Sequence, residues 1–302
     1  MRNFTFKGLF LAVVFIVLGS LSIQAADGLI TKQITIKLDE AGTLPNKIGS
    51  TKKFQITNLK IIGEINGRDL QMIREMAGKD VRGNDTDGML SVLDLSDAKI
   101  VEGGGYNING FYYPTSNDKI GDNAFCDCSG LTSLTLPSGV TEIGNAAFEG
   151  CSGLASLTLP SGVTKIGDNA FCDCSGLTSL TLPSDVTEIG NAAFLECSGL
   201  TSIYVYAEKL PNMGNDVFEG CDAKKCTVYV PKGTYDDYWL SEFGYFENIV
   251  EFDPTGINNV ITSNDAKELS RYSVNGQRLS APTKGLNIVK YSDGSVKKVA
   301  VQ

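Results

Sequence analysis

Hydrophobic and polar residues follow a pattern along this chain that repeats every 23 residues. An Ile-Gly pair recurs at residues 120–121, 143–144, 166–167 and 189–190, and a phenylalanine follows each pair at a fixed distance. The regular repeats also share the spacing Leu-x-x-Leu-x-Leu, first at Leu131, Leu134 and Leu136. A period of roughly 20–29 residues with this leucine spacing is typical of leucine-rich-repeat solenoids. The pattern therefore predicts a repeat protein.

Each repeat is expected to contribute one short strand. In Leu134-Thr135-Leu136 a polar residue separates two leucines, so both leucines lie on the inward face of the strand. One coil cannot bury this apolar face alone, whereas coils stacked roughly 4.8 Å apart form a parallel sheet. The expected fold is an α/β-type solenoid, a right-handed leucine-rich-repeat coil with a parallel concave β-sheet.

Weaker copies of the pattern flank the regular repeats. The spacing recurs in residues 56–61 and 90–95, which predicts two irregular coils before the repeats. Between them we expect a short helix that Asp69 caps and Gly78 ends. After the repeats, an aromatic-rich segment is expected to cover the last open edge. Its apolar residues are Tyr235, Trp239, Phe243, Phe246 and Ile249.

These patterns divide the chain into five expected segments. Residues 1–26 have the basic, apolar and small-residue order of a secretory signal peptide, which predicts export from the cytoplasm. The tail carries alternating apolar residues joined through Asn-Gly and Asp-Gly, the pattern of β-hairpins. The other segments are the N-terminal cap with irregular coils and an aromatic insertion (27–118), the regular repeats (119–231), the C-terminal cap (232–254), and a linker with a small β-rich tail module (255–302).

Composition removes several classes of function. The 302 residues include no histidine, so Ser-His-Asp and Cys-His nucleophile pairs and histidine-containing zinc sites cannot form. The net charge of −9 argues against a nucleic-acid binder, which needs a basic face. We therefore expect a non-enzymatic protein that binds no nucleic acid and spans no membrane once its signal peptide is cleaved.

The cysteines and acidic residues predict no cofactor and no metal site. All eight cysteines lie between residues 126 and 226, and five occupy equivalent repeat positions. Equivalent side chains point the same way, so we expect buried reduced thiols, with Cys221–Cys226 as the pair best placed for a disulfide. Cys126-x-Cys128 lacks the usual zinc-ligand spacing, and residues 85–88 lack the first and last ligands of a calcium loop.

Two surfaces are candidate binding sites. The first is the concave face of the sheet, where residues between the inward positions point outward. Its predicted contact residues are Ser133, Thr135, Ser156, Thr158, Ser179, Thr181, Ser202, Tyr204, Tyr206 and Tyr229. The same hydroxyl-rich strip is equally the pattern of a solubilising β-surface.

The second candidate surface is an insertion of about 18 residues after the second irregular strand. Leu95 precedes Ile120 by 25 residues, whereas Leu136 precedes Ile143 by 7. Aromatic residues on a flexible loop can anchor a protein or a sugar. The alternative is an insertion that folds over the sheet edge and buries its rings. The aromatic residues are Tyr106, Phe111, Tyr112 and Tyr113.

The motif Ile-Gly-x-x-Ala-Phe-x-x-Cys-Ser-Gly-Leu-Thr-Ser-Leu-x-Leu-Pro, at residues 120–137 and 166–183, resembles BspA-like leucine-rich repeats of the Bacteroidetes type. The resemblance implies a cell-surface or secreted protein that binds host matrix proteins or other bacteria, as relatives that bind fibronectin and fibrinogen do. It transfers no fixed ligand residues. The tail is similar to a short type IX secretion C-terminal sorting domain; the alternative is a β-module that acts only as a stalk.

The expected function is therefore non-enzymatic binding of macromolecular partners outside the cell. The partners implied are extracellular-matrix or other surface proteins. Localisation is expected at the cell surface or outside the cell, on the exterior of the bacterial outer membrane, with the periplasm as the alternative. A second candidate is a carbohydrate-binding surface protein that uses Tyr106, Tyr112, Tyr113 and Tyr204 as stacking platforms, and a third is a purely structural coat protein.

Overall fold

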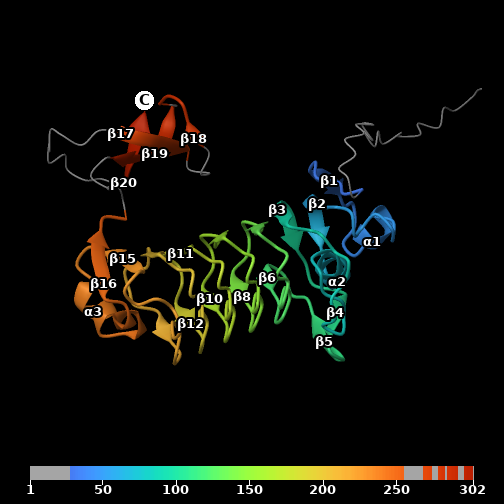
Figure 1. The fold of residues 1–302 in the computed structure, drawn as a ribbon, viewed down its shortest axis with the longest axis horizontal. Helices are drawn as coiled ribbons and strands as arrows, with labels where there is room; N and C mark the ends of the chain where they lie inside the picture. Colours follow the sequence, from blue (N-terminus) through green and yellow to red (C-terminus); the bar gives the residue numbers. More distant parts are fainter. Residues whose placement is uncertain (1–27, 255–267, 274–277, 283, 292–295, 302) are drawn as a thin grey trace, which may run out of the picture.

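The structure, a computed structural model, describes residues 28–301 except for 255–267, 274–277, 283 and 292–295. The expected signal peptide and most of the linker before the tail lie outside the described residues. The described chain forms a stack of coils with one parallel sheet running along its length (Figure 1). This is the predicted leucine-rich-repeat solenoid.

The long sheet has nine strands in the order β1-β2-β3-β7-β9-β11-β13-β15-β16. Every neighbouring pair is parallel, and adjacent repeats pair in register, so that Leu180 lies opposite both Leu157 and Ile203. Two strands were not expected, one at each edge, β1 and β16. The strands are β1 (Ile34–Lys37), β2 (Asn58–Ile65), β3 (Val92–Ile100), β7 (Ser133–Thr135), β9 (Ser156–Thr158), β11 (Ser179–Leu182), β13 (Ser202–Val205), β15 (Thr227–Pro231) and β16 (Asn248–Phe252).

A second parallel sheet stacks the Ile-Gly positions, in the order β14-β12-β10-β8-β6. The sequence did not predict this sheet, because strands of two residues show no alternation. Its strands are β6 (Lys119–Ile120), β8 (Glu142–Ile143), β10 (Lys165–Ile166), β12 (Glu188–Ile189) and β14 (Asn212–Met213). Figure 1 shows this sheet below the long sheet, and the five coils from β3 to β14 each contribute one strand to both.

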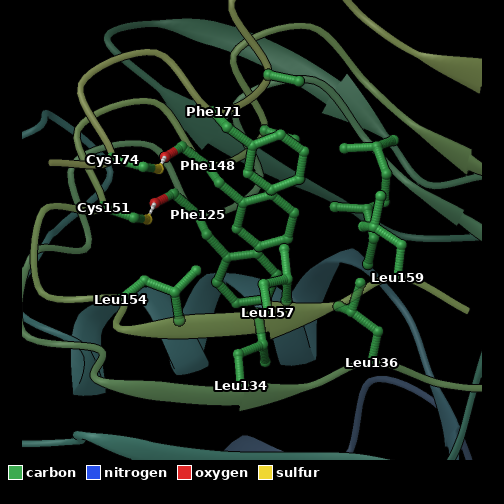
Figure 2. Packing of buried hydrophobic residues seen from close by; sticks show 14 of the residues in the cluster. Phe125, Leu134, Leu136, Phe148, Cys151, Leu154, Leu157, Leu159, Phe171 and Cys174 are labelled. Carbon is green, nitrogen blue, oxygen red and sulfur yellow. Dashed lines mark hydrogen bonds between the residues drawn. The ribbon is translucent and has the colours of Figure 1, made fainter. Parts of the chain in front are cut away.

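The core between the sheets is a ladder of identical side chains. Phe148 stacks on Phe125 and Phe171 with ring centroids 5.3 and 5.1 Å apart, and all three rings are fully buried. The thiol of Cys151 donates to the carbonyl of Phe125 at 3.1 Å, and that of Cys174 donates in the same way to Phe148 (Figure 2). Cys197 and Cys221 repeat this bond. All eight cysteines are unpaired, including Cys221 and Cys226.

Polar side chains fix the register between coils. The Asp122 carboxylate accepts the Asn145 backbone N–H at 2.8 Å, and the same bond continues through residues 145, 168 and 191. Gly144 permits the close approach: a Cβ there would lie 2.7 Å from the Gly121 carbonyl carbon. Lys119 pairs with Glu142 at 2.6 Å and Lys165 with Glu188 at 2.8 Å; these ion pairs are half-exposed and weak.

Two helices and a hairpin close the N-terminal end, namely α1 (Leu44–Lys47), α2 (Gly67–Met76), and β4 (Gly105–Ile108) with β5 (Phe111–Pro114). The capping residue of α2 is Asn66, and Asp69 is its partner in a capping box rather than the cap itself. The buried Asp69 carboxylate also accepts the backbone N–H groups of Gly42 and Leu44, which ties α1 to α2.

Arg74 and Tyr106 complete this cap. The buried Arg74 guanidinium donates to the carbonyls of Asn123, Ala124 and Cys126 at 3.0–3.3 Å, and the Tyr106 hydroxyl donates to the Asp122 carbonyl at 2.7 Å. In later coils the equivalents of the carbonyls at 122, 124 and 126 accept backbone N–H groups from the coil before. The cap therefore substitutes for a missing coil.

The C-terminal cap differs from the expected one. Phe243 and Phe246 are buried against Phe218, as predicted, within α3 (Tyr235–Trp239), the 3-10 helix η1 (Glu242–Tyr245) and the residue after it. The sequence wrongly predicted that Tyr235 and Trp239 cover the edge. They stack on each other in solvent, because Tyr238 takes the buried position and donates to the Ala207 carbonyl.

The tail is a separate antiparallel sheet of four strands, in the order β18-β17-β19-β20. Its strands are β17 (Glu268–Ser273), β18 (Arg278–Leu279), β19 (Gly285–Tyr291) and β20 (Val296–Val301). Antiparallel neighbours agree with the hairpin pattern of the sequence. Over the part of the chain that the structure covers, no helix has the length and apolar content needed to cross a bilayer.

Candidate interaction surface

The outward face of the nine-stranded sheet, here called the sheet face, carries the predicted contact residues. Along β7 and β9 an exposed hydroxyl residue, a buried leucine and another exposed hydroxyl residue follow one another. In β11 and β13 the outward residues are partly buried and the alternation is the same. The orientation predicted for Ser133, Thr135, Ser156, Thr158, Ser179, Thr181, Ser202 and Tyr204 is that of the structure.

Hydroxyl groups in the repeats have two different roles. Thr132, Thr178 and Thr201, at the strand entries, donate to carbonyls of the preceding coil at 3.0–3.1 Å. Threonines 141, 164 and 187, beside the second sheet, do the same at 3.1–3.3 Å. On the sheet face, by contrast, Ser202 bonds Ser179 at 3.0 Å, and the described chain offers no partner to the hydroxyls of Ser133, Thr135, Ser156, Thr158 and Thr181.

The two ends of the sheet face differ in chemistry. At the N-terminal end, Lys60 pairs with Asp94 at 2.9 Å and with Asp97 at 2.8 Å. At the C-terminal end, the Tyr204 and Tyr229 rings stack with centroids 4.6 Å apart and planes 6° from parallel. The hydroxyl strip over β7, β9 and β11 therefore lies between an ion cluster and an aromatic cluster.

Phe252 belongs to the aromatic cluster and was not predicted from the sequence. Its ring packs edge-on against Tyr206 at 5.3 Å and Tyr204 at 6.3 Å. Phe252 reaches this face because β16 pairs with β15 and extends the sheet by one strand. The sequence signal was an apolar residue two positions after Val250, in a segment that was interpreted as part of the cap.

The insertion is a hairpin, and only part of it faces solvent. Tyr106 is fully buried, stacks on Tyr113 at 5.6 Å and bonds the backbone of the first coil, so the expected contact role of Tyr106 is wrong. Tyr113 is half-buried against the core. Phe111 and Tyr112 remain available at 69% and 60% exposure. Tyr106 and Tyr113 lie opposite each other where the hairpin meets the cap, whereas Phe111, paired with Ile108 next to the turn, extends into solvent.

The described residues hold no group of three or more carboxylate and thiol side chains arranged to bind a metal ion. The thiols are held neutral: burial raises the pKa of Cys128 to about 11 and that of Cys174 to about 12. Besides the ion cluster, the sheet face offers hydrogen bonding by hydroxyl groups and contact with aromatic rings.

Three solved structures are similar to this chain. TpLRR, a leucine-rich repeat protein from T. pallidum, is 35% identical over 37% of this chain and 51% of that one, with a TM-score of 0.34. A leucine-rich repeat protein from Bacteroides ovatus ATCC 8483 is 17% identical over 76% of this chain and 64% of that one, with a TM-score of 0.35. The pneumococcal vaccine antigen PcpA is 14% identical over 65% of this chain and 57% of that one, with a TM-score of 0.35.

This chain thus spans between half and two thirds of the length of each of those structures. No curated protein matches it. A family model described as "BspA type Leucine rich repeat region" matches six copies within residues 104–232. That range contains the coils whose leucines, phenylalanines and cysteines form the buried ladders. Residues 104–232 of this chain therefore match leucine-rich repeats of the BspA type.

Proposed function

We propose that this protein is an exported, non-enzymatic surface protein that binds macromolecular partners through its sheet face, in adhesion to matrix proteins or other cells. The main support is the contrast between the two sets of hydroxyl groups. Threonines that stabilise the stack donate to carbonyls, whereas the sheet-face hydroxyls of Ser133, Thr135, Ser156, Thr158 and Thr181 meet no partner in the described chain. Solenoids commonly bind partners along such extended sheets.

The proposal includes the five segments of the chain. Residues 1–26 direct export, residues 27–118 and 232–254 close the two ends of the solenoid, and residues 119–231 present most of the sheet face. The β-rich tail, residues 255–302, serves in sorting to the exterior of the outer membrane or as a stalk. The match of the repeat region to the BspA type supports a surface location.

The sheet face can be tested by blocking it with one charge. Thr158 lies at its centre and is exposed, and Ser161 is an equally exposed residue in the turn after the same strand. We expect Thr158→Lys to weaken binding to immobilised fibronectin or fibrinogen at least about tenfold, because a charge at the centre of an interface must be desolvated. Ser161→Lys should leave binding unchanged, as measured by surface plasmon resonance.

If Thr158→Lys leaves binding unchanged, the exposed ring of Tyr112 is the alternative binding site. The Tyr112 ring lies over Gly105, is held by a hydroxyl bond to the Gly104 carbonyl at 2.9 Å, and exposes its other face. Such a ring is a platform for a sugar. Saturable binding of a free glycan that is lost in Tyr112→Ala, with no effect of Thr158→Lys on any ligand, would replace the sheet-face proposal with carbohydrate binding.

A further inference from the structure

The C-terminal end of the sheet face carries a prearranged group of aromatic side chains, here called the aromatic end: Tyr204, Tyr206, Tyr229 and Phe252. All four are partly exposed. The parallel stack of Tyr204 on Tyr229 and the edge-on contacts of Phe252 hold the rings in place. Rings that are already fixed lose little conformational entropy when a ligand binds, so this group is suited to be an anchor.

The four side chains of the aromatic end carry no charge. The outward residues around it on β11, β13 and β15 are Ser179, Thr181, Ser202 and Thr227, so no charged side chain points outward from these three strands. Burial raises the pKa of Tyr204, so its hydroxyl stays neutral. In the part of the chain that the structure describes, the hydroxyls of Tyr204 and Tyr229 have no protein partner. The surface therefore offers apolar ring edges and hydroxyl donors to an uncharged ligand.

The backbone of β13 and β15 is not available to a ligand that lies over this face. β13 is paired with β11 and β15, and β15 is paired with β16, so their amide and carbonyl groups bond one another. An ordinary extended peptide lying over the face would leave its own N–H groups facing aromatic rings without acceptors, which is costly. An α-helix would present few free carbonyls to the tyrosine hydroxyls, because its carbonyls are bonded internally.

A sugar is also a poor fit to this end of the sheet. A sugar ring stacks on the face of an aromatic side chain, and Tyr204 and Tyr229 use a face each on one another at 4.6 Å. The two ring faces that meet in the stack are closed to a sugar, whereas the ring edges and the hydroxyls remain available to a ligand. A polyproline II segment meets these conditions, because its carbonyls are free to accept hydrogen bonds and its prolines have no N–H group to satisfy.

We propose that the aromatic end binds a proline-rich segment of a partner protein in the polyproline II conformation. The hydroxyls of Tyr204 and Tyr229 donate to carbonyls of the segment, and its proline rings pack against the edges of Tyr206 and Phe252. Positions 204 and 206 are about 7 Å apart along the strand, close to the roughly 6 Å that two residues of a polyproline II segment span. This inference rests on the proposed function and names the partner segment that the sheet face takes.

The test uses the mature chain, residues 27–302, and a fluorescent decaproline peptide as the probe. Threonine is the matched replacement at position 204, because Thr135, Thr158 and Thr181 occupy the equivalent positions of coils with the same fold. We expect saturable binding with a dissociation constant below about 1 mM and a loss of at least about tenfold in the double variant Tyr204→Thr/Tyr229→Thr. Tyr229→Phe, which keeps the ring and removes the hydroxyl, should bind several-fold more weakly.

The control variant is Trp239→Thr, which removes an exposed aromatic ring outside both candidate surfaces and should bind decaproline as the unchanged chain does. A glycine-serine decamer should not bind. Absence of saturable decaproline binding, or an equal loss in Trp239→Thr, would overturn the inference. If decaproline does not bind but Thr158→Lys still weakens fibronectin or fibrinogen binding, the proposed function holds and only the proline-rich partner is wrong. If neither decaproline nor a matrix protein binds, the inference and the proposed function both fail.

Discussion

At the first repeat coil, the backbone carbonyls of Asp122, Ala124 and Cys126 have no preceding coil to donate to them. Arg74 and Tyr106 supply the missing donors from the cap. A buried carbonyl without a donor is costly, so these two side chains stabilise the open end of the stack. This also explains why an aromatic residue in the insertion is buried: its hydroxyl completes the backbone bonding of the coil.

Tyr106→Phe tests this role at a single atom. The substitution removes the hydroxyl that bonds the Asp122 carbonyl and leaves the ring in place, so we expect the free energy of unfolding to fall by about 1–3 kcal/mol. The matched control is Tyr112→Phe, which removes an exposed hydroxyl bonded to Gly104 and should change stability by less than about 0.5 kcal/mol. Urea denaturation measures both, and equal effects would contradict the role of Tyr106.

At the scale of the element, each coil repeats the same buried thiol and phenylalanine. Burial raises the pKa of Cys174 to about 12, and burial also raises the pKa values of Cys151 and Cys197 well above 9. In the unfolded chain the thiols lose their protons near pH 9, while the folded chain keeps them. The unfolded state therefore binds fewer protons above pH 9, and stability must fall as the pH rises toward 12.

The comparison is a variant in which Cys151, Cys174 and Cys197 are replaced by alanine. Between pH 9 and pH 11 the free energy of unfolding of the unchanged chain should fall more steeply than that of this variant. The difference isolates the thiols from lysine and tyrosine residues that titrate in the same range. Curves of equal slope in the two proteins would disprove the role of the buried thiols in the pH dependence.

Access to the thiols is a separate test. At pH 8 a thiol reagent should label Cys126, the one partly exposed cysteine, far faster than the seven buried ones.

At the scale of the whole molecule, the polar residues between coils alternate with a period of two coils. Lys119, Glu142, Lys165 and Glu188 alternate in sign, and the Asx ladder alternates between aspartate and asparagine. Deleting residues 142–187 therefore places Lys119 beside Glu188 and preserves every type of contact. Deleting residues 142–164 places Lys119 beside Lys165 and Asp122 beside Asp168.

Both deletion variants should fold, and they should differ in their response to salt. The two-coil deletion should lower the urea m-value by about a fifth, in proportion to the surface removed, and respond to salt as the full chain does. The one-coil deletion should become more stable as sodium chloride rises from 0.05 to 0.5 M, because salt screens the new like-charge pairs. A similar salt response in both deletions would show that the alternation has no energetic role.

Several features of the fold were predictable because they depend on local periodicity. Leu134 and Leu136 alternate with polar residues, and their burial in one strand followed directly. The sequence did not predict the two-residue strand at Ile143 or the edge strand β16. Neither segment has an alternation of apolar and polar residues that marks it as a strand, and each forms through pairing with a neighbouring strand. On the candidate surface, outward orientation was predictable at Thr135 and Thr158, whereas the contribution of Phe252 depends on a strand pairing between distant segments.

The sequence by itself determined that this protein is a stack of equivalent coils. Identical side chains at a fixed period must meet identical neighbours, so the sequence alone implied the leucine, phenylalanine and cysteine ladders and their burial. Only the tertiary structure decided how the stack ends and which polar groups remain available. Both depend on which backbone carbonyls have no donor from a neighbouring coil. Tyr106 is buried because its hydroxyl donates to such a carbonyl, that of Asp122, whereas the Thr158 hydroxyl has no such carbonyl within reach and remains at the surface.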